Sequence, residues 1–175
     1  MRIEWRNGIV YLPALLAVLA LKQHYSTASV EALRWILAPT AAFVAAVRGA
    51  PFVFEAHAGY VSRELHFVIA ESCAGINFMI VVFCASIVAY TRYARTNPQR
   101  LLLFFGGLLF SYLAAIAANS IRILIALPLH LNAVSWGWWT PGRIHRLEGT
   151  VVYLTVLCLL FISSRWVVMR CVNQP

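Results

Sequence analysis

The sequence predicts an all-α multi-pass membrane protein, and its composition and the pattern of its apolar runs support this prediction. Of the 175 residues, 62% are hydrophobic and only 11% are charged, whereas a soluble domain carries about 25% charged residues. The chain contains no aspartate and a single lysine, Lys22. Its apolar residues form long runs, and most of its arginines lie near the ends of those runs. We therefore expect one integral membrane domain over residues 1–175.

About six apolar segments are expected to be helical. Five of them run over residues 8–21, 34–47, 74–91, 101–118 and 150–164, and a shorter one covers 121–131. Several are shorter than the roughly 20 residues that cross a bilayer, so we expect tilting or local thinning of the membrane. The segment 121–131 contains Pro128 and is interpreted as a half-helix or re-entrant piece, which requires protein or water around its backbone.

The two longer connections between these segments are expected to carry structure of their own. Residues 61–69 approximately alternate apolar and polar side chains, which predicts a strand. Phe52, Phe54 and the Ala58-Gly59 turn predict a partner strand, so a small β-hairpin should precede Cys73. The connection 132–146 contains three tryptophans that favour either the membrane interface or a binding groove. They are Trp136, Trp138 and Trp139.

The distribution of positive charge predicts which ends of the helices face the cytoplasm. The formal net charge of +8 is scattered along the chain rather than gathered in one stripe. This pattern fits lipid headgroups and control of topology, and it does not support nucleic-acid binding. The loop 91–100 and the C-terminal tail carry arginines and no acid, so both should be cytoplasmic. Cys73, Arg122 and His145 would then all lie at the outer face.

The N-terminal segment leaves its own orientation open. It follows two arginines, Arg2 and Arg6, and resembles a signal peptide. Because no small-x-small cleavage site is evident after it, we expect a retained first helix. Two spans before Cys73 would place the N-terminus outside, whereas the two arginines favour the inside.

Among four cysteines without CxxC or metal-type spacing, Cys73 has distinctive neighbours. It lies in Glu71-Ser-Cys-Ala-Gly-Ile-Asn77, where a long apolar run begins. Ser72 and Asn77 offer hydrogen bonds that a packing cysteine does not need, Gly75 allows close backbone approach, and a helix N-terminus stabilises a thiolate. A buried, inert thiol is the alternative. Cys84 and Cys158 are interpreted as small core residues, and Cys171 lies in a polar tail.

Two further polar positions complete a possible reactive set. Arg122 follows Asn119 by three residues, so both lie on one helical face. An arginine among apolar runs marks a functional site or else snorkels to lipid headgroups. His145 lies one turn before Glu148, and it can exchange a proton with a thiol or remain a solvated interfacial side chain. A cysteine, a histidine and an arginine together supply the nucleophile, the base and the oxyanion donor of acyl transfer.

In order along the chain, Cys73-Ala-Gly-Ile76, Asn119-x-x-Arg122 and the late His145 resemble the motifs of the exosortase/archaeosortase family. The resemblance covers about residues 50–165. It implies a cysteine protease or transpeptidase of the bacterial cytoplasmic (inner) membrane, with Cys73, Arg122 and His145 as an extracytoplasmic triad. The implied partners are exported proteins with a short C-terminal motif, a transmembrane helix and a basic tail. The short chain is similar to the subtype called exosortase K.

Several residues around this triad receive supporting roles. Ser72, Gly75, Asn119 and Glu148 are expected to shape the site. The hairpin, together with Trp136, Trp138, Trp139 and Arg143, is a candidate for holding the recognition motif. No cofactor or metal site is indicated. The competing classes are a non-enzymatic assembly scaffold, a small transporter, and a thiol–disulfide oxidoreductase, for which a resolving cysteine near Cys73 is missing.

Overall fold

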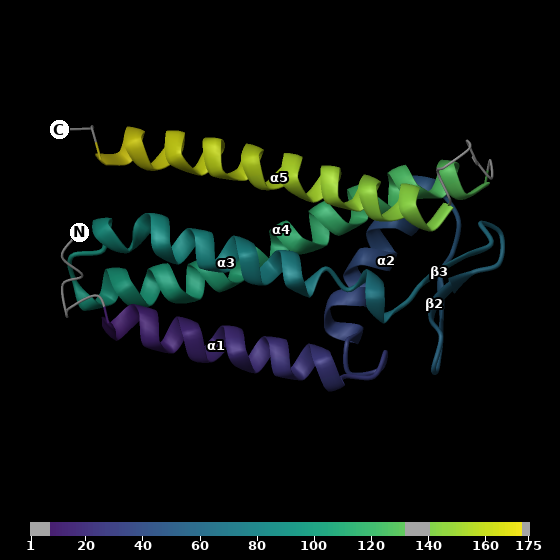
Figure 1. Cartoon of the computed structure of the whole chain (residues 1–175), viewed down its shortest axis with the longest axis horizontal. Coiled ribbons are helices and arrows are strands. Elements are labelled where there is room, and N and C mark those ends of the chain that lie inside the picture. The colour runs from purple at the N-terminus through teal and green to yellow at the C-terminus, as the bar shows by residue number, and fades with distance from the viewer. Residues whose placement is uncertain (1–7, 132–140, 173–175) are drawn as a thin grey trace. The chain divides into compact units, whose positions relative to one another are not determined.

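The computed structural model describes residues 8–131 and 141–172 and is mostly helical (Figure 1). The chain divides into two compact units, Met1–Asn119 and Ser120–Pro175. The first contains α1 (Gly8–Thr27), α2 (Arg34–Arg48), a three-stranded sheet, α3 (Ile76–Tyr90) and most of α4 (Asn97–Leu131). The second contains the last turns of α4 and α5 (Pro141–Val172).

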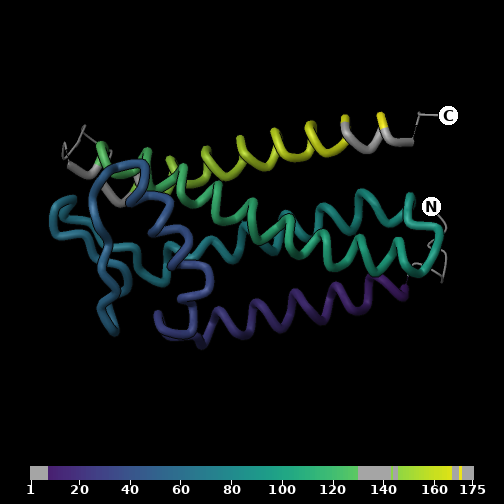
Figure 2. Tube along the Cα trace, turned by 180° about the vertical axis from the view of Figure 1, so that it is seen from behind, coloured from purple at the N-terminus to yellow at the C-terminus, as the bar shows by residue number. Residues whose placement is uncertain are grey.

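The core of the first unit lies where α1, α3 and α4 run side by side, as Figures 1 and 2 both show. Val10 and Ala14 of α1 contact Phe83 and Ile87 of α3 in a buried cluster. Phe104 of α4 packs against this cluster, and its ring meets Phe83 edge-on with centroids 5.6 Å apart. Such edge-to-face pairs fill a core with well-defined geometry. Hence the three helices pack against one another through one shared apolar cluster.

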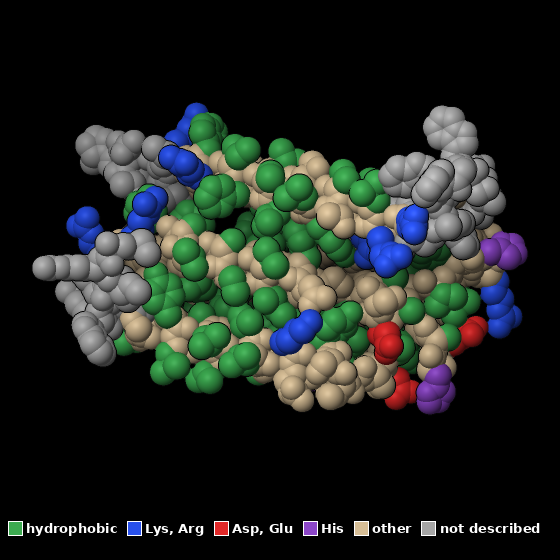
Figure 3. All heavy atoms as spheres, in the orientation of Figure 1, with side chains coloured by type: hydrophobic (Ala, Val, Ile, Leu, Met, Phe, Trp, Pro, Cys, Tyr) green, Lys and Arg blue, Asp and Glu red, His purple; other side chains and the backbone are tan. Residues whose placement is uncertain are grey.

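The outward faces of these helices are also apolar. Leu12, Leu15, Leu16 and Leu19 of α1 are each more than half exposed, and Figure 3 shows hydrophobic side chains covering the helices on the side drawn. A helix that is hydrophobic on all sides is at home in a lipid environment. Among the described residues, four helical stretches are long and apolar enough to cross a membrane: Gly8–Thr27, Glu71–Tyr93, Asn97–Leu129 and Arg146–Trp166.

α2 is tied to α4 at the point where a proline interrupts its hydrogen bonding. Pro39 has no N–H, so it cannot donate to the carbonyl of Trp35 four residues earlier. The hydroxyl of Tyr112 on α4 donates to that carbonyl instead, at 2.8 Å, and the Tyr112 ring stacks on the Trp35 ring. The proline therefore exposes an acceptor that α4 satisfies.

A three-stranded antiparallel sheet joins α2 to α3. It consists of β1 (Val53–Glu55), β2 (Gly59–Ser62) and β3 (Phe67–Ile69), in that order. Gly59 has a φ of 113°, and a Cβ there would collide with the carbonyl oxygen of Ile69 on β3. The glycine thus lets β2 approach the end of β3 closely. On the side drawn in Figure 3, acidic and histidine side chains gather around this sheet.

The structure corrects several expectations about the segments. The count of about six is not confirmed, because the described residues form five α-helices. The segment 121–131 is not a separate half-helix but the continuation of α4. The hairpin has a third strand, since residues 63–66 form a turn within the predicted strand 61–69.

Other corrections concern the last helix and two cysteines. α5 begins at Pro141, so residues 141–146 are helical rather than part of a loop. Trp136, Trp138 and Trp139 lie outside the described residues. Cys84 and Cys158 are exposed rather than buried in the core, because each lies on an outward face of its helix.

Candidate active site

Cys73 lies in a short turn between the sheet and α3. β3 ends at Ile69, and residues Glu71–Cys73 form one turn of 3-10 helix, in which the N–H of Cys73 donates to Ala70 at 2.9 Å. Gly75 follows with a φ of 69°, a left-handed conformation that favours glycine. This change of direction delays the start of α3 to Ile76, two residues later than predicted. Cys73 therefore precedes the N-terminus of α3 and is only 8% exposed.

Asn119 of α4 holds the backbone of Cys73. Its side-chain Nδ2 donates a hydrogen bond to the carbonyl oxygen of Cys73, and Asn119 is completely buried. A buried amide needs such a partner, because leaving it unsatisfied in a low-dielectric interior is costly. The two motifs identified in the sequence are thus in direct contact within the first unit. The contact acts on the backbone beside the thiol.

The other polar neighbours of Cys73 face outward. Ser72 and Asn77 are both exposed. Asn77 accepts a hydrogen bond from Nζ of Lys22 at 3.0 Å, which links α1 to the first turn of α3. Lys22 was not recognised as part of this region, although it is the only lysine of the chain. Its position near the end of the first apolar run was the available signal.

Arg122 lies in the second unit, against α5. Its guanidinium lies over the ring of Tyr153, 5.4 Å from the centroid, and Nη1 donates to the Tyr153 hydroxyl at 3.4 Å. Its Nε passes so close to Gly149 that a Cβ built there would lie 2.5 Å away. Glu148, half-buried on the same helix, interacts electrostatically with Arg122. The arginine is therefore directed at a protein surface and not simply extended into lipid headgroups.

Tyr153 was missed by the sequence analysis. It follows Gly149 by four residues, and Gly149 follows His145 by four, so the three positions lie along one strip of α5. This spacing was the available signal. His145 lies in the second turn of α5, and its side chain lies outside the described part of the structure. Arg143 is exposed.

The structure brings together two parts of the predicted site, each within one unit. Cys73 meets Asn119 in the first unit, and Arg122 meets Glu148 in the second. The expected approaches of Arg122 and His145 to Cys73 would join the two units, and they stay predictions. Where side chains are described, no group of three or more His, Cys, Asp or Glu is arranged to hold a metal ion.

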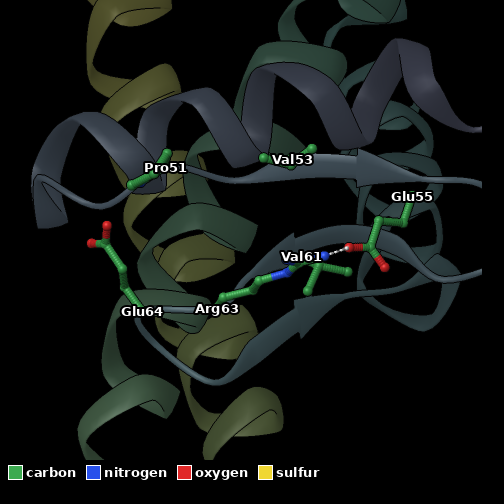
Figure 4. A pocket seen from close by; sticks show the side chains of 6 residues that line it. All are labelled: Pro51, Val53, Glu55, Val61, Arg63 and Glu64. Carbon is green, nitrogen blue, oxygen red and sulfur yellow. Dashed lines mark hydrogen bonds and ion pairs between the residues drawn. The ribbon is translucent and has the colours of Figure 1, made fainter.

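A cavity of about 310 Å³ lies on the sheet that leads to Cys73 (Figure 4). Val53 and Val61, which are partners across β1 and β2, form its apolar floor. Arg63 reaches toward Glu55, with 3.4 Å between Nη2 and Oε1; the Arg63 side chain is exposed and that of Glu55 is partly exposed. Pro51 and Glu64 complete the lining. The cavity thus combines an apolar floor with an accessible ion pair.

Comparison with known proteins identifies a family to which the chain is similar. The family model described as transmembrane exosortase matches residues 7–162. No curated protein and no solved structure matches the chain. The matched range includes Cys73, Arg122 and His145, as well as the sheet and all five helices in whole or in part.

Proposed function

The chain belongs to the transmembrane exosortase family, and from this membership we propose that it is a membrane cysteine protease or transpeptidase that processes C-terminal sorting signals of exported proteins. The observation that carries the proposal is the hydrogen bond from Asn119 to the carbonyl of Cys73. It joins two motifs that are 46 residues apart in sequence. A cysteine that served only as a packing residue would not need this hydrogen bond to its backbone. The subtype exosortase K rests on chain length alone.

The helical position of Arg122 supports its role as oxyanion donor. Asn119 and Arg122 are three residues apart in the continuous helix α4, and side chains at this spacing share a face. Since Asn119 bonds to Cys73, we expect the guanidinium to be directed toward the thiol. A fixed cation beside a forming oxyanion stabilises the transition state, and loss of one such donor costs about 10²–10³ in rate.

His145 is the candidate base. It precedes Gly149 by one turn of α5, and Gly149 contacts Arg122. We therefore expect the imidazole near the guanidinium and near the thiol. In the proposed reaction His145 takes the proton of Cys73, and the thiolate attacks the scissile carbonyl. The tetrahedral intermediate collapses to a thioester as the leaving amine receives the proton from His145. Water or an acceptor amine then resolves the thioester.

The candidate spans support an extracytoplasmic site. Among the described residues, one candidate span, Gly8–Thr27, precedes Cys73, because α2 has only 15 residues and is not among the four candidates. The N-terminal arginines and the arginines of the loop 91–100 then lie on the same side of the membrane, which the positive-inside rule makes cytoplasmic. Cys73 lies on the opposite side. With one span before Cys73, the N-terminus is cytoplasmic, as Arg2 and Arg6 favour.

The proposed substrate carries a short motif outside the membrane, an apolar helix within it and a basic tail inside. The exposed apolar faces of the helices suit contact with another transmembrane helix in lipid. The cavity over Val53 and Val61 is a candidate place for the short motif. It lies on β1 and β2, and the neighbouring strand β3 ends shortly before Cys73. Its accessible ion pair offers both charges to a peptide.

The test is processing of a tailed exported protein in cells that express wild type or Cys73→Ala. We expect the substrate to stay at its unprocessed mass with Cys73→Ala at normal protein levels. Cys84→Ala is the matched control, since Cys84 is exposed on α3 and has no proposed role. Processing at the wild-type rate by Cys73→Ala would leave an assembly scaffold as the better account. The mass of the product distinguishes hydrolysis from transfer to an amine.

A further inference from the structure

In the second unit, two residues outside the three sequence motifs lie against the side chain of Arg122. Gly149 and Tyr153 of α5 lie one helical turn apart and both contact the guanidinium group. Gly149 leaves room for the guanidinium because it has no Cβ, and Tyr153 supplies an aromatic ring for it to lie on. We propose that Gly149 and Tyr153 are positioning residues that fix the guanidinium of Arg122 for oxyanion binding. The inference rests on the function proposed above and adds these two residues to its site.

Gly149 is required by the path of the arginine side chain. It is buried, and a Cβ built on it would lie 2.5 Å from Nε, 3.1 Å from Cζ and 3.2 Å from Nη2 of Arg122. Because real Cβ contacts are longer than this, alanine would displace the guanidinium rather than merely touch it. The backbone of Gly149 is helical, so conformational freedom does not explain a glycine here. Close passage of Arg122 does.

Tyr153 gives the guanidinium a defined plane. Cζ of Arg122 lies 5.4 Å from the ring centroid, within the roughly 6 Å over which a cation is attracted to an aromatic face. The hydroxyl accepts a long hydrogen bond from Nη1 at 3.4 Å. At 3.4 Å this hydrogen bond is longer than the usual range of about 2.7–3.2 Å, so we assign the positioning to the ring more than to the hydroxyl. Glu148, next to Gly149 on α5, also interacts electrostatically with Arg122.

Positioning of this kind affects rate through geometry. A displacement of about 1 Å in a reacting or stabilising group costs on the order of 10²-fold in rate. We therefore expect Gly149→Ala and Tyr153→Leu each to lower kcat by about that factor with little change in KM. Tyr153→Phe, which keeps the ring, should retain most of the rate. The recovery by phenylalanine separates a loss of the aromatic surface from a loss of the hydroxyl.

The experiment uses the full chain in lipid vesicles with an exported protein that carries the motif, helix and basic tail. Gly106→Ala is the control for the glycine, because a Cβ at Gly106 meets nothing within 4 Å. Tyr93→Leu is the control for the tyrosine, because Arg92 lies over the Tyr93 ring at 4.8 Å, in the loop away from Cys73. Thermal unfolding of every variant is recorded beside kcat and KM.

A double-mutant cycle tests whether Gly149 and Tyr153 act through Arg122. In an Arg122→Lys background, where no guanidinium remains to be displaced, Gly149→Ala and Tyr153→Leu should each cost much less than in wild type. A residue that only stabilises the fold would cost the same in both backgrounds. Full additivity overturns the inference. So does a wild-type rate for both Gly149→Ala and Tyr153→Leu.

Failure of this inference is distinguishable from failure of the proposed function. If Cys73→Ala processes the substrate at the wild-type rate, the function is wrong and the positioning roles fall with it. If Cys73→Ala is inactive while Gly149→Ala and Tyr153→Leu work normally, only the positioning roles are wrong. If Gly149→Ala unfolds at a lower temperature than Gly106→Ala, its loss of rate can come from a weakened fold. The comparison of Tyr153→Leu with Tyr153→Phe then tests the positioning roles.

Discussion

The side chain of Asn119 donates a hydrogen bond to the backbone carbonyl of Cys73, and this bond fixes the turn that carries the thiol against α4. Both residues are buried. The carbonyl ends a single turn of 3-10 helix, whose last carbonyls have no partner within the helix itself. A side chain from another helix supplies that partner. The position of the thiol therefore depends on packing between α3 and α4 and not on the local sequence alone.

Replacing Asn119 by alanine should weaken both the fold and the processing activity. The substitution leaves the Cys73 carbonyl buried without its donor, which costs about 1–3 kcal/mol in free energy of unfolding. Asn119→Asp should cost more, because a carboxylate would face the carbonyl oxygen. Unfolding in detergent and substrate processing are the measurements. Asn77→Ala, on the exposed side of α3, is the control and should stay within about 0.5 kcal/mol of wild type.

Gly75→Ala should disturb Cys73 more than an equally strained substitution elsewhere. Gly75 has a φ of 69° and Gly49, which caps α2, has a φ of 66°. Alanine in this left-handed conformation costs about 1–2 kcal/mol at either position. Only Gly75 lies beside Cys73. We expect both variants to lose similar stability, but only Gly75→Ala to raise the rate at which a thiol reagent labels Cys73.

The labelling is measured in a background with Cys84, Cys158 and Cys171 replaced by serine, so that Cys73 is the single thiol. In wild type Cys73 is 8% exposed and should react slowly. Equal labelling rates for Gly75→Ala and Gly49→Ala would show that the left-handed glycine does not hold the thiol in place.

The sequence predicted the location of the first part of the site because its signals are local. Cys73, Gly75 and the start of an apolar run are neighbours, and the structure places a turn and then a helix there. The helical segments 8–21 and 34–47 were found for the same reason, since a long apolar run is itself the signal of a membrane helix. Only their ends differ from the prediction.

The errors arose where a polar residue was interpreted as a break. Asn119 and Arg122 interrupt the apolar run, so the predicted helix ended at residue 118 and the short segment 121–131, which contains Pro128, was interpreted as a half-helix. In the structure α4 continues through both, because each finds a partner in another segment: the Cys73 carbonyl for Asn119 and the Tyr153 ring for Arg122. A partner 46 residues earlier or 31 residues later leaves no local signal. Conversely, His66 adopts a φ of 48° and helps to form a turn within a strand that alternation alone had extended.

Ser120→Ala should be neutral or stabilising, unlike most substitutions in a buried helix. Ser120 is completely buried, and its Oγ has no hydrogen-bond partner among the described residues. Removing a buried hydroxyl that lacks a partner removes a desolvation cost, so the free energy of unfolding should stay equal or rise by up to about 1 kcal/mol. Ser111→Ala is the control on the same helix, because Ser111 Oγ donates to the Leu108 carbonyl at 2.8 Å. A loss of more than about 1 kcal/mol for Ser120→Ala would contradict the prediction and indicate a partner such as a bound water.

Tyr112→Phe should destabilise the chain through a carbonyl on another helix. The Tyr112 hydroxyl donates to the Trp35 carbonyl, which has lost its helical donor because residue 39 is proline. Phenylalanine keeps the ring stack with Trp35 but removes the donor to that carbonyl, and because this hydrogen bond is exposed the cost should be about 0.5–1.5 kcal/mol. Unfolding in detergent measures the loss.

The proline makes this prediction unusually specific, because it can be removed. In a Pro39→Ala background residue 39 regains an N–H, and the Trp35 carbonyl can accept the ordinary helical hydrogen bond from it. Tyr112→Phe should then cost about 1 kcal/mol less than it does in wild type. If the two substitutions are simply additive, the tyrosine stabilises the helix pair by its ring alone. A coupling of the predicted sign would instead show that a hydrogen-bond donor missing from α2 is replaced by a side chain of α4.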